Sequence, residues 1–395
     1  YRNTPVVALT QHKDDTWTVH TEHGDIDCDI VVNACGYRVN EVGAMMGVHH
    51  PVMSMEHQYF LTEPIQQIID AGHRMPLIRC PISDYYCRQE KNGLLVGFYE
   101  QGCKTWGMDG IDPNFVNALC PDDLERVMDV LEGAFARMPA LQEVGIHTVV
   151  NGPITYTIDG APLVGPIPGK RNAFCIIGLR AGLGEGGGHG WLLAQQIVHG
   201  EACYDTWCLD PRRYAGHANV ELCAEMAIQE YQNEFRFHFP NEHRPAGRPA
   251  RTTPITPVLE TENAEFTVVN GWERAEYFKP TADFHTTPTF MFDEAHEIVA
   301  DEVKAVQTGV GLCEVNGFNR FAITGADRHS FLDRMFCGTV TKKAYRVGLG
   351  YLLNHHGMVK GEATVANLPA SDRGPDRVWY GSAAASETHD MDWLT

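Results

Sequence analysis

The sequence lacks the short motifs that mark common metal and hydrolase sites. Its twelve cysteines include no C-x-x-C pair, which argues against zinc ribbons and thioredoxin-like redox motifs. No H-E-x-x-H occurs, and His49, His50 and His57 form no i,i+4 pair with a third ligand. A G-x-S-x-G elbow is also missing. We therefore expect neither a metal site nor serine-hydrolase chemistry.

Positive charge and long apolar runs are scarce. The chain has 31 Lys and Arg against 51 Asp and Glu, a formal net charge of -20, which disfavours nucleic-acid binding. Hydrophobic residues make up 44% of the chain without a long apolar stretch, so we expect no membrane span. No signal or transit peptide is visible. These features predict a protein of the cytoplasm, or of the mitochondrial matrix in a eukaryote, with free and mostly buried thiols.

Glycine, by contrast, is concentrated in one place. The segment 151–166 and the apolar AFCIIGL precede the run GLGEGGGHG at 182–190, which leads into the helical pattern WLLAQQIVHG. This order predicts a strand, a tight loop and a helix start. Glycine lets a backbone approach a flat or anionic ligand closely, and a helix start turns free N–H groups toward it.

Three interpretations of the glycine run remain open. Gly182-x-Gly184-x-x-Gly187 formally matches the dinucleotide fingerprint of an NAD-dependent dehydrogenase. That interpretation needs a second strand carrying the ribose-binding acid, and the residues around Asp205 and Asp210 are not strand-like. A loop under a flavin ring is favoured over it, and a plain structural turn is the third interpretation.

The chain divides into three regions with both α/β and α+β character. The first is expected to carry strands and helices, the second is rich in proline and arginine, and in the third a helix-and-strand pattern restarts. The expected elements are strands in 1–35, 92–99 and 173–179, and helices at 122–137, 189–199, 293–307 and 326–336. Both ends look like cuts from something longer.

Several segments, in this order, resemble the dimethylglycine and sarcosine dehydrogenase family. They are VVNACGYRVNEVGAMMGV (31–48), MEHQYFLTEP (55–64), NGPITYTIDGAPLVGP (151–166), GGGHGWLLAQQIVHGE, the connector ending in GWER (271–274), and VGLGYLLNHHGMVKGEATV. Family members are FAD-dependent oxidoreductases of the D-amino-acid-oxidase type with an appended aminomethyltransferase-like folate-binding domain.

The resemblance implies a domain order and a function. Residues 1–205 would be the carboxy-terminal part of the oxidoreductase domain, with its substrate sheet and flavin-ring loop. Residues 206–280 would be a connector domain, and 281–395 the first part of the folate domain. The implied function is FAD-dependent N-demethylation of dimethylglycine, sarcosine or a related N-methyl amino acid, with transfer of the carbon to tetrahydrofolate. This places the protein in glycine betaine catabolism and one-carbon metabolism, with an electron-transferring flavoprotein or oxygen as acceptor.

The sequence also departs from the family. The amino-terminal βαβ unit that holds the ADP half of FAD is absent from it, as is the second half of the folate domain. The expectation is therefore that this polypeptide alone binds FAD weakly and is inactive. A cofactor-free, non-catalytic fragment is accordingly an alternative, beside the NAD-dependent dehydrogenase.

The resemblance implies His57 and Tyr86 as catalytic residues. Removing a hydride equivalent from an N-methyl group needs a neutral amine, and a histidine is suited to hold or accept the proton. The simplest expectation is an acid limb in the pH profile near the ordinary pKa of histidine. Tyr85 and Tyr86 should point to opposite faces of a strand, so only one can reach the site. A solvent-facing histidine and a core tyrosine are the structural alternatives.

Two arginines are candidates for the carboxylate of an amino-acid substrate. Arg88 lies two residues after Tyr86, hence on the same face, and could form a bidentate contact. Arg180, just before the glycine run, competes for the same role. A solvated arginine is the alternative for Arg88.

The remaining assignments concern cofactors. The resemblance assigns flavin contacts to the loop 184–188 (Gly184, Glu185, Gly186, Gly187 and Gly188), to Gly36 at the end of IVVNACG, and to Val6 on the adenine side. We expect this loop to meet His57 and Tyr86 at one cleft. For folate, Glu362 stands where many relatives have aspartate, and Thr364 follows on the same face. The longer arm moves the carboxylate by roughly 1.5 Å, enough to put one-carbon transfer in question. A solvated glutamate on an edge strand is the alternative.

Overall fold

The computed structural model describes all 395 residues, which form two compact units. Unit 1 comprises Tyr1–Pro211, Ala218–Arg248 and Pro288–Met291. Unit 2 comprises Arg212–His217, Pro249–Thr287 and Phe292–Thr395. Each unit has its own sheets and core and is described by itself.

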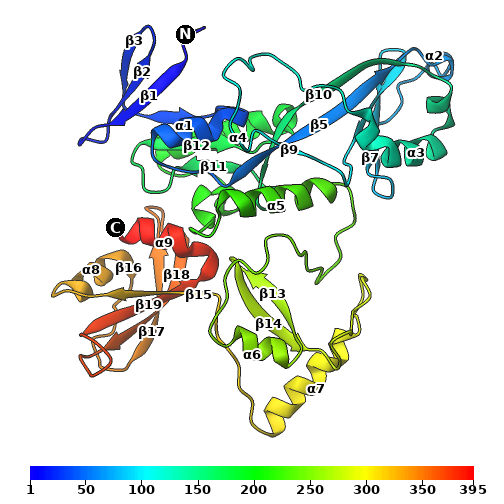
Figure 1. Cartoon of the computed structure of the whole chain (residues 1–395). Coiled ribbons are helices and arrows are strands. Elements are labelled where there is room, and N and C mark those ends of the chain that lie inside the picture. The colour runs from blue at the N-terminus through cyan, green and yellow to red at the C-terminus, as the bar shows by residue number, and fades with distance from the viewer. The chain divides into compact units, whose positions relative to one another are not determined.

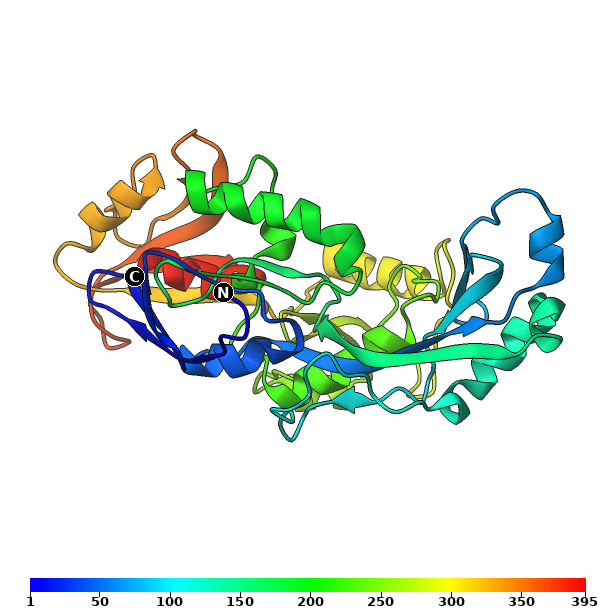
Figure 2. The ribbon, with the colours of Figure 1, turned by 90° about the horizontal axis from the view of Figure 1, so that it is seen from above.

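The main sheet of unit 1 has six strands (Figure 1). Its order is β10-β5-β8-β7-β6, with β9 also pairing with β5. The strands are β5 (Val52–Thr62), β6 (Ile78–Cys80), β7 (Tyr85–Glu90), β8 (Gly93–Phe98), β9 (Thr105–Trp106) and β10 (Ile146–Thr157). The two longest strands, β5 and β10, form the extended antiparallel ribbon seen in Figure 2.

The two faces of this sheet carry different layers. On one face, Phe60, Tyr85 and Phe98 pack with Val130 and Leu131 of α3 (Met128–Arg137) in a continuous apolar core. The expected helix at 122–137 is therefore confirmed in its second half, while 124–127 form a single 3-10 turn. Because side chains alternate along a strand, the neighbours of these core residues point to the opposite face.

That opposite face is covered by α5 (Val220–Gln232), which packs on β5 and β10. Cys223, Ala227 and Tyr231 recur at a helical spacing and are buried, which explains the orientation of the helix. The side chain of Asn219 caps its start by accepting the backbone N–H of Leu222 at 2.9 Å.

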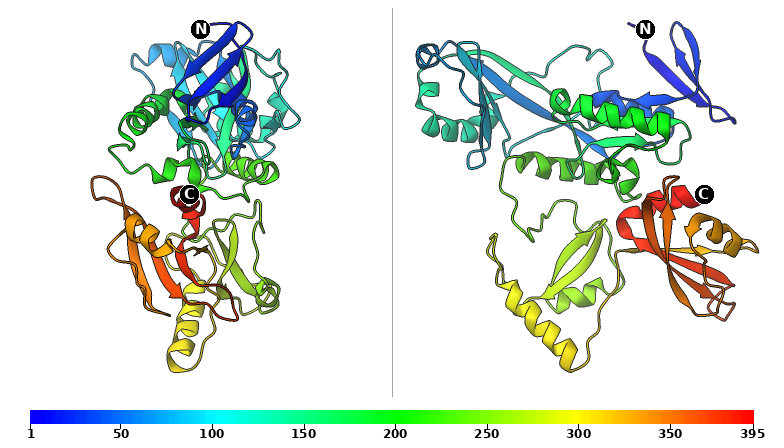
Figure 3. Two further views of the ribbon diagram at one scale, coloured as in Figure 1. Left: turned by 90° about the vertical axis from the view of Figure 1, so that its left-hand side faces the viewer. Right: turned by 180° about the vertical axis from the view of Figure 1, so that it is seen from behind.

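Unit 1 has two smaller sheets. The first is an antiparallel meander of β1 (Val6–Gln11), β2 (Trp17–Thr21) and β3 (Gly24–Cys28). The second has the order β11-β12-β4, formed by β11 (Leu163–Pro166), β12 (Ala173–Ile177) and the parallel strand β4 (Val31–Asn33). Helix α4 (Gly182–His199) contacts β11 and β12 (Figure 3).

The glycine run is helical, which corrects the expected loop at 184–188. Strand, turn and helix follow in the expected order, but α4 begins at Gly182. The N–H groups of Gly184 and Glu185 donate to the Ala181 carbonyl at 2.8 and 3.0 Å and close the first turn. Glycine lowers helix propensity by about 1 kcal/mol relative to alanine, a cost that the later apolar turns of α4 offset.

Other short elements connect the sheets. The helices are α1 (Val39–Met45) and α2 (Gln66–Asp70), and the 3-10 turns are η1 (Gly36–Arg38), η2 (Leu124–Val127), η3 (Pro139–Gln142), η4 (Trp207–Leu209), η5 (Pro211–Arg213) and η6 (Ala384–Ser386). Only η4, η5, α5 and α6 (Thr256–Thr261) follow α4 before the next strand, β13. Asp205 and Asp210 therefore have no strand to carry them, which weighs against the NAD interpretation.

Unit 2 is built around a five-stranded antiparallel sheet of order β15-β19-β18-β17-β16. Its strands are β15 (Phe318–Ile323), β16 (Phe336–Cys337), β17 (Val347–Leu353), β18 (Val359–Leu368) and β19 (Arg377–Ala383). The core lies on one face, where Leu332 of α8 (Arg328–Met335) packs with Leu352, Val365 and Tyr380. Unit 2 also holds the hairpin β13 (Ala264–Val269) and β14 (Trp272–Phe278), and the helices α6 (Thr256–Thr261), α7 (Ala295–Thr308) and α9 (Glu387–Leu394).

Several sequence expectations are settled by these elements. All twelve cysteines are free, as expected, but they are not mostly buried, because five are exposed (Cys35, Cys203, Cys208, Cys313 and Cys337). The helices expected at 293–307 and 326–336 are α7 and α8. No helix has the length and apolar character needed to cross a membrane.

Candidate active site

His57 and Tyr86 meet on the face of the main sheet that α5 covers. They come from β5 and β7, which are separated by β8, and His57 Nε2 lies 3.0 Å from Tyr86 Oη. Tyr85 faces the opposite core, so the expected alternation of the two tyrosines is confirmed. Tyr86 reaches across β8 because its partner there is Gly97, where a Cβ atom would overlap the tyrosine ring.

The second ring nitrogen of His57 is held by a residue far away in sequence. His57 Nδ1 lies 3.0 Å from the hydroxyl of Tyr231, near the end of α5. That hydroxyl donates toward two acceptors, the Phe98 carbonyl at 3.2 Å and Glu100 Oε2 at 3.1 Å. Both nitrogens of His57 therefore have a phenol as partner, and Tyr231 is itself fully buried.

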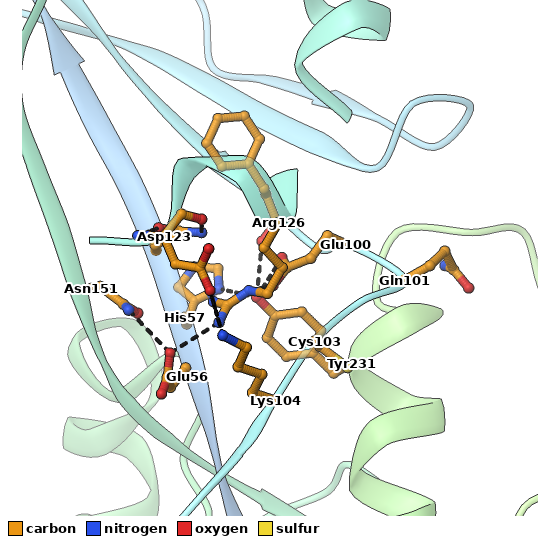
Figure 4. A network of polar contacts seen from close by, with 12 residues as sticks. Glu56, His57, Glu100, Gln101, Cys103, Lys104, Asp123, Arg126, Asn151 and Tyr231 are labelled. Carbon is orange, nitrogen blue, oxygen red and sulfur yellow. Dashed lines mark hydrogen bonds and ion pairs between the residues drawn. The ribbon is translucent and has the colours of Figure 1, made fainter. Parts of the chain in front are cut away.

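Tyr231 contacts a buried ion-pair network through Glu100 (Figure 4). Arg126, with its side chain 4% exposed, places Nε 2.6 Å from Glu100 and Nη1 2.9 Å from Glu56. It also lies 3.5 Å from Asp123, and Asn151 donates to Glu56 at 3.2 Å. A charge this deeply buried is tolerated only when it is paired, and Arg126 is paired with three carboxylates.

Aromatic rings form a wall around His57. The ring centroid of Tyr99 lies 4.8 Å from that of His57, and Phe235 lies 4.8 Å beyond Tyr99. Tyr86 contacts both, at 6.2 and 5.9 Å. Such rings offer apolar surface and negative π-faces, which suit the methyl groups and cationic nitrogen of an amine.

The two candidate arginines lie in different surroundings. Arg180 stands over the Tyr156 ring with 5.2 Å between guanidinium carbon and ring centroid, and it pairs with Glu234. Tyr156 also donates to Glu234, at 3.3 Å, and its ring centroid lies 5.8 Å from that of Tyr231, which connects Arg180 to the surroundings of His57. Arg88 pairs with Glu90 at 2.6 Å, and both side chains are more than a third exposed.

Burial shifts the pKa values of these groups toward their neutral forms. The pKa of His57 is lowered to about 4, mainly by burial and further by the nearby charge of Arg126. Burial and the neighbouring phenols of Tyr99 and Tyr59 raise the pKa of Tyr86. His57 and Tyr86 are therefore a neutral imidazole and a neutral phenol at physiological pH. An acid limb in the pH profile that arises from protonation of His57 would therefore lie well below the physiological pH range.

The residues expected to hold the flavin lie in unit 1. Gly36 adopts φ +55 in η1, a conformation that favours glycine, rather than ending a strand, since β4 stops at Asn33. Val6 opens β1 and is 37% exposed. No hydrogen bond or ring contact described for His57 reaches the glycine run. The expected meeting of that run with His57 at one cleft stays a prediction.

Open space surrounds the start of α4. A Cβ atom added at any of Gly182, Gly184, Gly186, Gly187, Gly188 or Gly190 would meet nothing within 4 Å. Leu183 is fully exposed there, and the first turn carries Glu185. Free N–H groups, small residues and an uncovered apolar side chain fit a flat, partly anionic group such as a flavin ring.

The folate candidates lie on the uncovered face of the unit 2 sheet. Glu362 and Thr364 are exposed on β18, while Ala363 between them is buried in the core. β18 is the middle strand, so Glu362 does not lie on a sheet edge. It lies opposite Tyr351 of β17, and the negative charge of its carboxylate raises the pKa of that phenol.

Sequence reasoning missed the residues that surround His57 from other segments. Tyr231 lies in the region read as a connector, and Arg126 and Glu100 look like ordinary surface charges. Two signals could have pointed to them. Tyr231 falls on the apolar stripe of α5, and Glu100 is the second residue after β8, whose six residues GLLVGF are all buried.

Three family models match successive parts of the chain. The FAD dependent oxidoreductase model matches residues 1–196, its central domain 199–253, and the GCVT N-terminal domain 255–395. Together they show the expected fold class, an FAD-type oxidoreductase domain followed by an aminomethyltransferase-like domain.

Curated relatives match nearly the whole chain. Mitochondrial dimethylglycine dehydrogenase of Mus musculus is 34% identical over 99% of this chain and 45% of its own length. Mitochondrial sarcosine dehydrogenase of Homo sapiens is 29% identical over 93% and 43%. The mitochondrial pyruvate dehydrogenase phosphatase regulatory subunit of Mus musculus is 27% identical over 93% and 43%. The chain thus spans about half the length of the curated relatives it matches.

Proposed function

Because the chain belongs to the dimethylglycine and sarcosine dehydrogenase family, we propose that its residues take part in the FAD-dependent oxidation of an N-methyl amino acid. Dimethylglycine, sarcosine and related N-methyl amino acids form the substrate class. The observation that carries the proposal is the neutral His57–Tyr86 pair beside an aromatic wall, since a secondary or tertiary amine must lose its proton before oxidation.

The start of α4 is the part of this chain best suited to hold a flavin ring. Gly184, Glu185, Gly186, Gly187 and Gly188 leave open space there, with Gly36 and Val6 as further candidates. When bound, FAD would accept the hydride equivalent from the substrate methyl carbon. The positive end of α4 favours negative charge near it by about 0.3–2 kcal/mol.

The proton of the substrate ammonium goes to the His57–Tyr86 pair. The Tyr86 oxygen accepts it while the phenolic proton moves to His57 Nε2, 3.0 Å away. Because burial disfavours the imidazolium, His57 holds this proton only transiently. Burial favours neutral groups in this site, so the bound amine is also driven toward its neutral form. The nitrogen lone pair is then free to stabilise the cation that develops on the carbon.

Arg180 and the aromatic rings of Tyr99 and Phe235 orient the substrate. We assign the substrate carboxylate to Arg180, which is part of the aromatic site and is held by Glu234 and Tyr156. Arg88 is not assigned to the substrate carboxylate, because it is paired with Glu90 and partly exposed. The rings of Tyr99 and Phe235 accommodate the N-methyl groups.

The remaining parts of the proposal rest on family membership. The domains are 1–205 (oxidoreductase), 206–280 (connector) and 281–395 (folate domain). The electron acceptor is an electron-transferring flavoprotein or oxygen, and the compartment is the cytoplasm, or the mitochondrial matrix in a eukaryote. Glu362 and Thr364 face tetrahydrofolate, which receives the released carbon.

A regulatory, non-catalytic role is the second candidate, favoured by the likeness to the phosphatase regulatory subunit. Anaerobic titration of the flavin-loaded protein separates the two. Dimethylglycine or sarcosine should bleach the flavin absorbance, while glycine, which lacks the methyl group, should not. A spectrum unchanged by every N-methyl amino acid tested would favour the regulatory role.

A further inference from the structure

The hydrogen-bond chain around His57 determines which ring nitrogen carries the proton. A neutral imidazole has one N–H donor and one acceptor nitrogen, and its partners select between them. His57 has a phenol on each side, Tyr86 at Nε2 and Tyr231 at Nδ1, both at 3.0 Å. Two phenols alone would leave the choice open.

Glu100 removes that ambiguity on the Tyr231 side. Tyr231 has one proton, and two oxygens lie within its reach: Glu100 Oε2 at 3.1 Å and the Phe98 carbonyl at 3.2 Å. Neither offers a proton in return, because a carbonyl is only an acceptor and Glu100 is ion-paired to Arg126 at 2.6 Å. Burial raises the pKa of Glu100, but the charge of Arg126 and the hydrogen bond from Tyr231 favour its carboxylate form. Whichever oxygen Tyr231 donates to, its own oxygen is left to accept from His57.

We propose that Glu100, Arg126 and Tyr231 are positioning residues that hold the His57 proton on Nδ1 and keep Nε2 free as the acceptor for Tyr86. The proton order runs from the Tyr86 hydroxyl to Nε2, from Nδ1–H to the Tyr231 oxygen, and from the Tyr231 hydroxyl to Glu100. Each donor then has an acceptor, and the carboxylate of Glu100, which ends the chain of hydrogen bonds, is paired with Arg126.

The arrangement deepens the proposed function and rests on it for its catalytic meaning. With Nε2 unprotonated, Tyr86 can pass its proton to His57 as its oxygen takes one from the substrate amine. With the proton on Nε2 instead, His57 would donate to the Tyr86 oxygen and could no longer accept the Tyr86 proton. Tyr86 would then lose its base, and the His57–Tyr86 pair could not accept the substrate proton.

The proton position is measured directly by ¹⁵N NMR of the full chain labelled in histidine. The His57 signals are assigned by their loss in His57→Asn. At neutral pH we expect a protonated-type shift at Nδ1 and an unprotonated-type shift at Nε2. Tyr231→Phe removes only the bridging hydroxyl and should move both shifts toward a mixture of the two forms. Tyr85→Phe, which removes a tyrosine hydroxyl on the opposite face of β7, should leave them as in the wild type.

Two results would overturn the proposal. One is a wild-type spectrum with the proton on Nε2, which needs no variant to fold. The other is a folded Tyr231→Phe protein whose His57 shifts are unchanged. Flavin reduction by the amine is a separate readout, expected to slow roughly tenfold or more in Tyr231→Phe with little change in KM. If the wild type shows the expected shifts but no N-methyl amino acid reduces the flavin, the proton arrangement stands and the proposed function fails.

Discussion

At the scale of single residues, His57 is set apart by its surroundings rather than by its chemistry. Nineteen histidines occur in the chain, yet only His57 is described with phenols at both ring nitrogens. Burial and Arg126 lower its pKa to about 4. A group that would titrate near neutrality in water is therefore uncharged across the physiological range.

This shift makes a prediction about pH. In kcat/KM, the limb due to His57 should appear only as the pH falls through about 4, instead of near the usual value of about 6.5. The lowered pKa of His57 also makes the free energy of unfolding depend on pH. Between about pH 4 and 6.5 the unfolded chain binds a proton at this position that the folded chain does not, so stability is lost as the pH falls across that window. Urea unfolding of the wild type and of His57→Gln at pH 5 and 7 measures the contribution of His57 to this pH dependence of stability. An equal pH dependence in both proteins would contradict the shift.

Gly97 is tied to Tyr86 by space. A methyl group at residue 97 would overlap the Tyr86 ring, so Gly97→Ala should push Tyr86 away from His57 and slow flavin reduction by the amine. The nearest comparison is Gly102→Ala, where an added Cβ would meet only the Arg126 side chain, at 3.6 Å. A crystal structure of Gly97→Ala with Tyr86 in its original place would disprove the steric argument.

At the scale of elements, local sequence pattern predicts which face of a strand a residue occupies, whereas contacts between distant segments cannot be predicted from it. The alternation along SDYYCRQ placed Tyr86 on the face away from Tyr85, because a strand has a two-residue period. The glycine run was read as a loop because glycine is a poor helix former, whereas later turns of α4 pack on β11 and β12 and extend the helix back to Gly182. Tyr231 could not be assigned, since its contact with His57 spans 174 residues.

The start of α4 offers a test in which stability and cofactor binding move in opposite directions. Gly187→Ala adds a methyl group in open space and should raise the stability of the flavin-free protein by about 1 kcal/mol or less. If a flavin ring lies against this turn, the same methyl group should weaken flavin binding. Thermal unfolding and fluorescence titration with FAD measure the two effects. Ala194→Gly, later in the helix, should lower stability without changing flavin affinity. Unchanged affinity in Gly187→Ala would move the flavin away from this turn.

At the scale of the whole molecule, we assign two separate proposed chemistries to the two compact units. Oxidation is proposed for unit 1, and transfer of the released carbon for the sheet of unit 2, where Glu362 is exposed beside Tyr351. The sequence order of the three family models agrees with this division. The domain order could be read from motifs, while the composition of each site depended on residues from several strands.

The separation predicts that the two activities can be removed independently. Glu362→Ala should leave flavin reduction by the amine unchanged and lower the yield of methylene-tetrahydrofolate, with formaldehyde accumulating instead. His57→Ala should abolish both, because no carbon is released. Product analysis in the presence of tetrahydrofolate distinguishes these cases. Equal methylene-tetrahydrofolate yield in wild type and Glu362→Ala would remove Glu362 from the transfer step.

The most direct test of the central claim is single-turnover flavin reduction at neutral pH. The flavin-loaded wild type and His57→Ala are mixed anaerobically with dimethylglycine or sarcosine, and the loss of flavin absorbance is followed in a stopped-flow instrument. We expect His57→Ala to reduce the rate about a hundredfold or more, while both proteins unfold at similar temperatures. Equal reduction rates in the two proteins would contradict the assignment of the active site to His57.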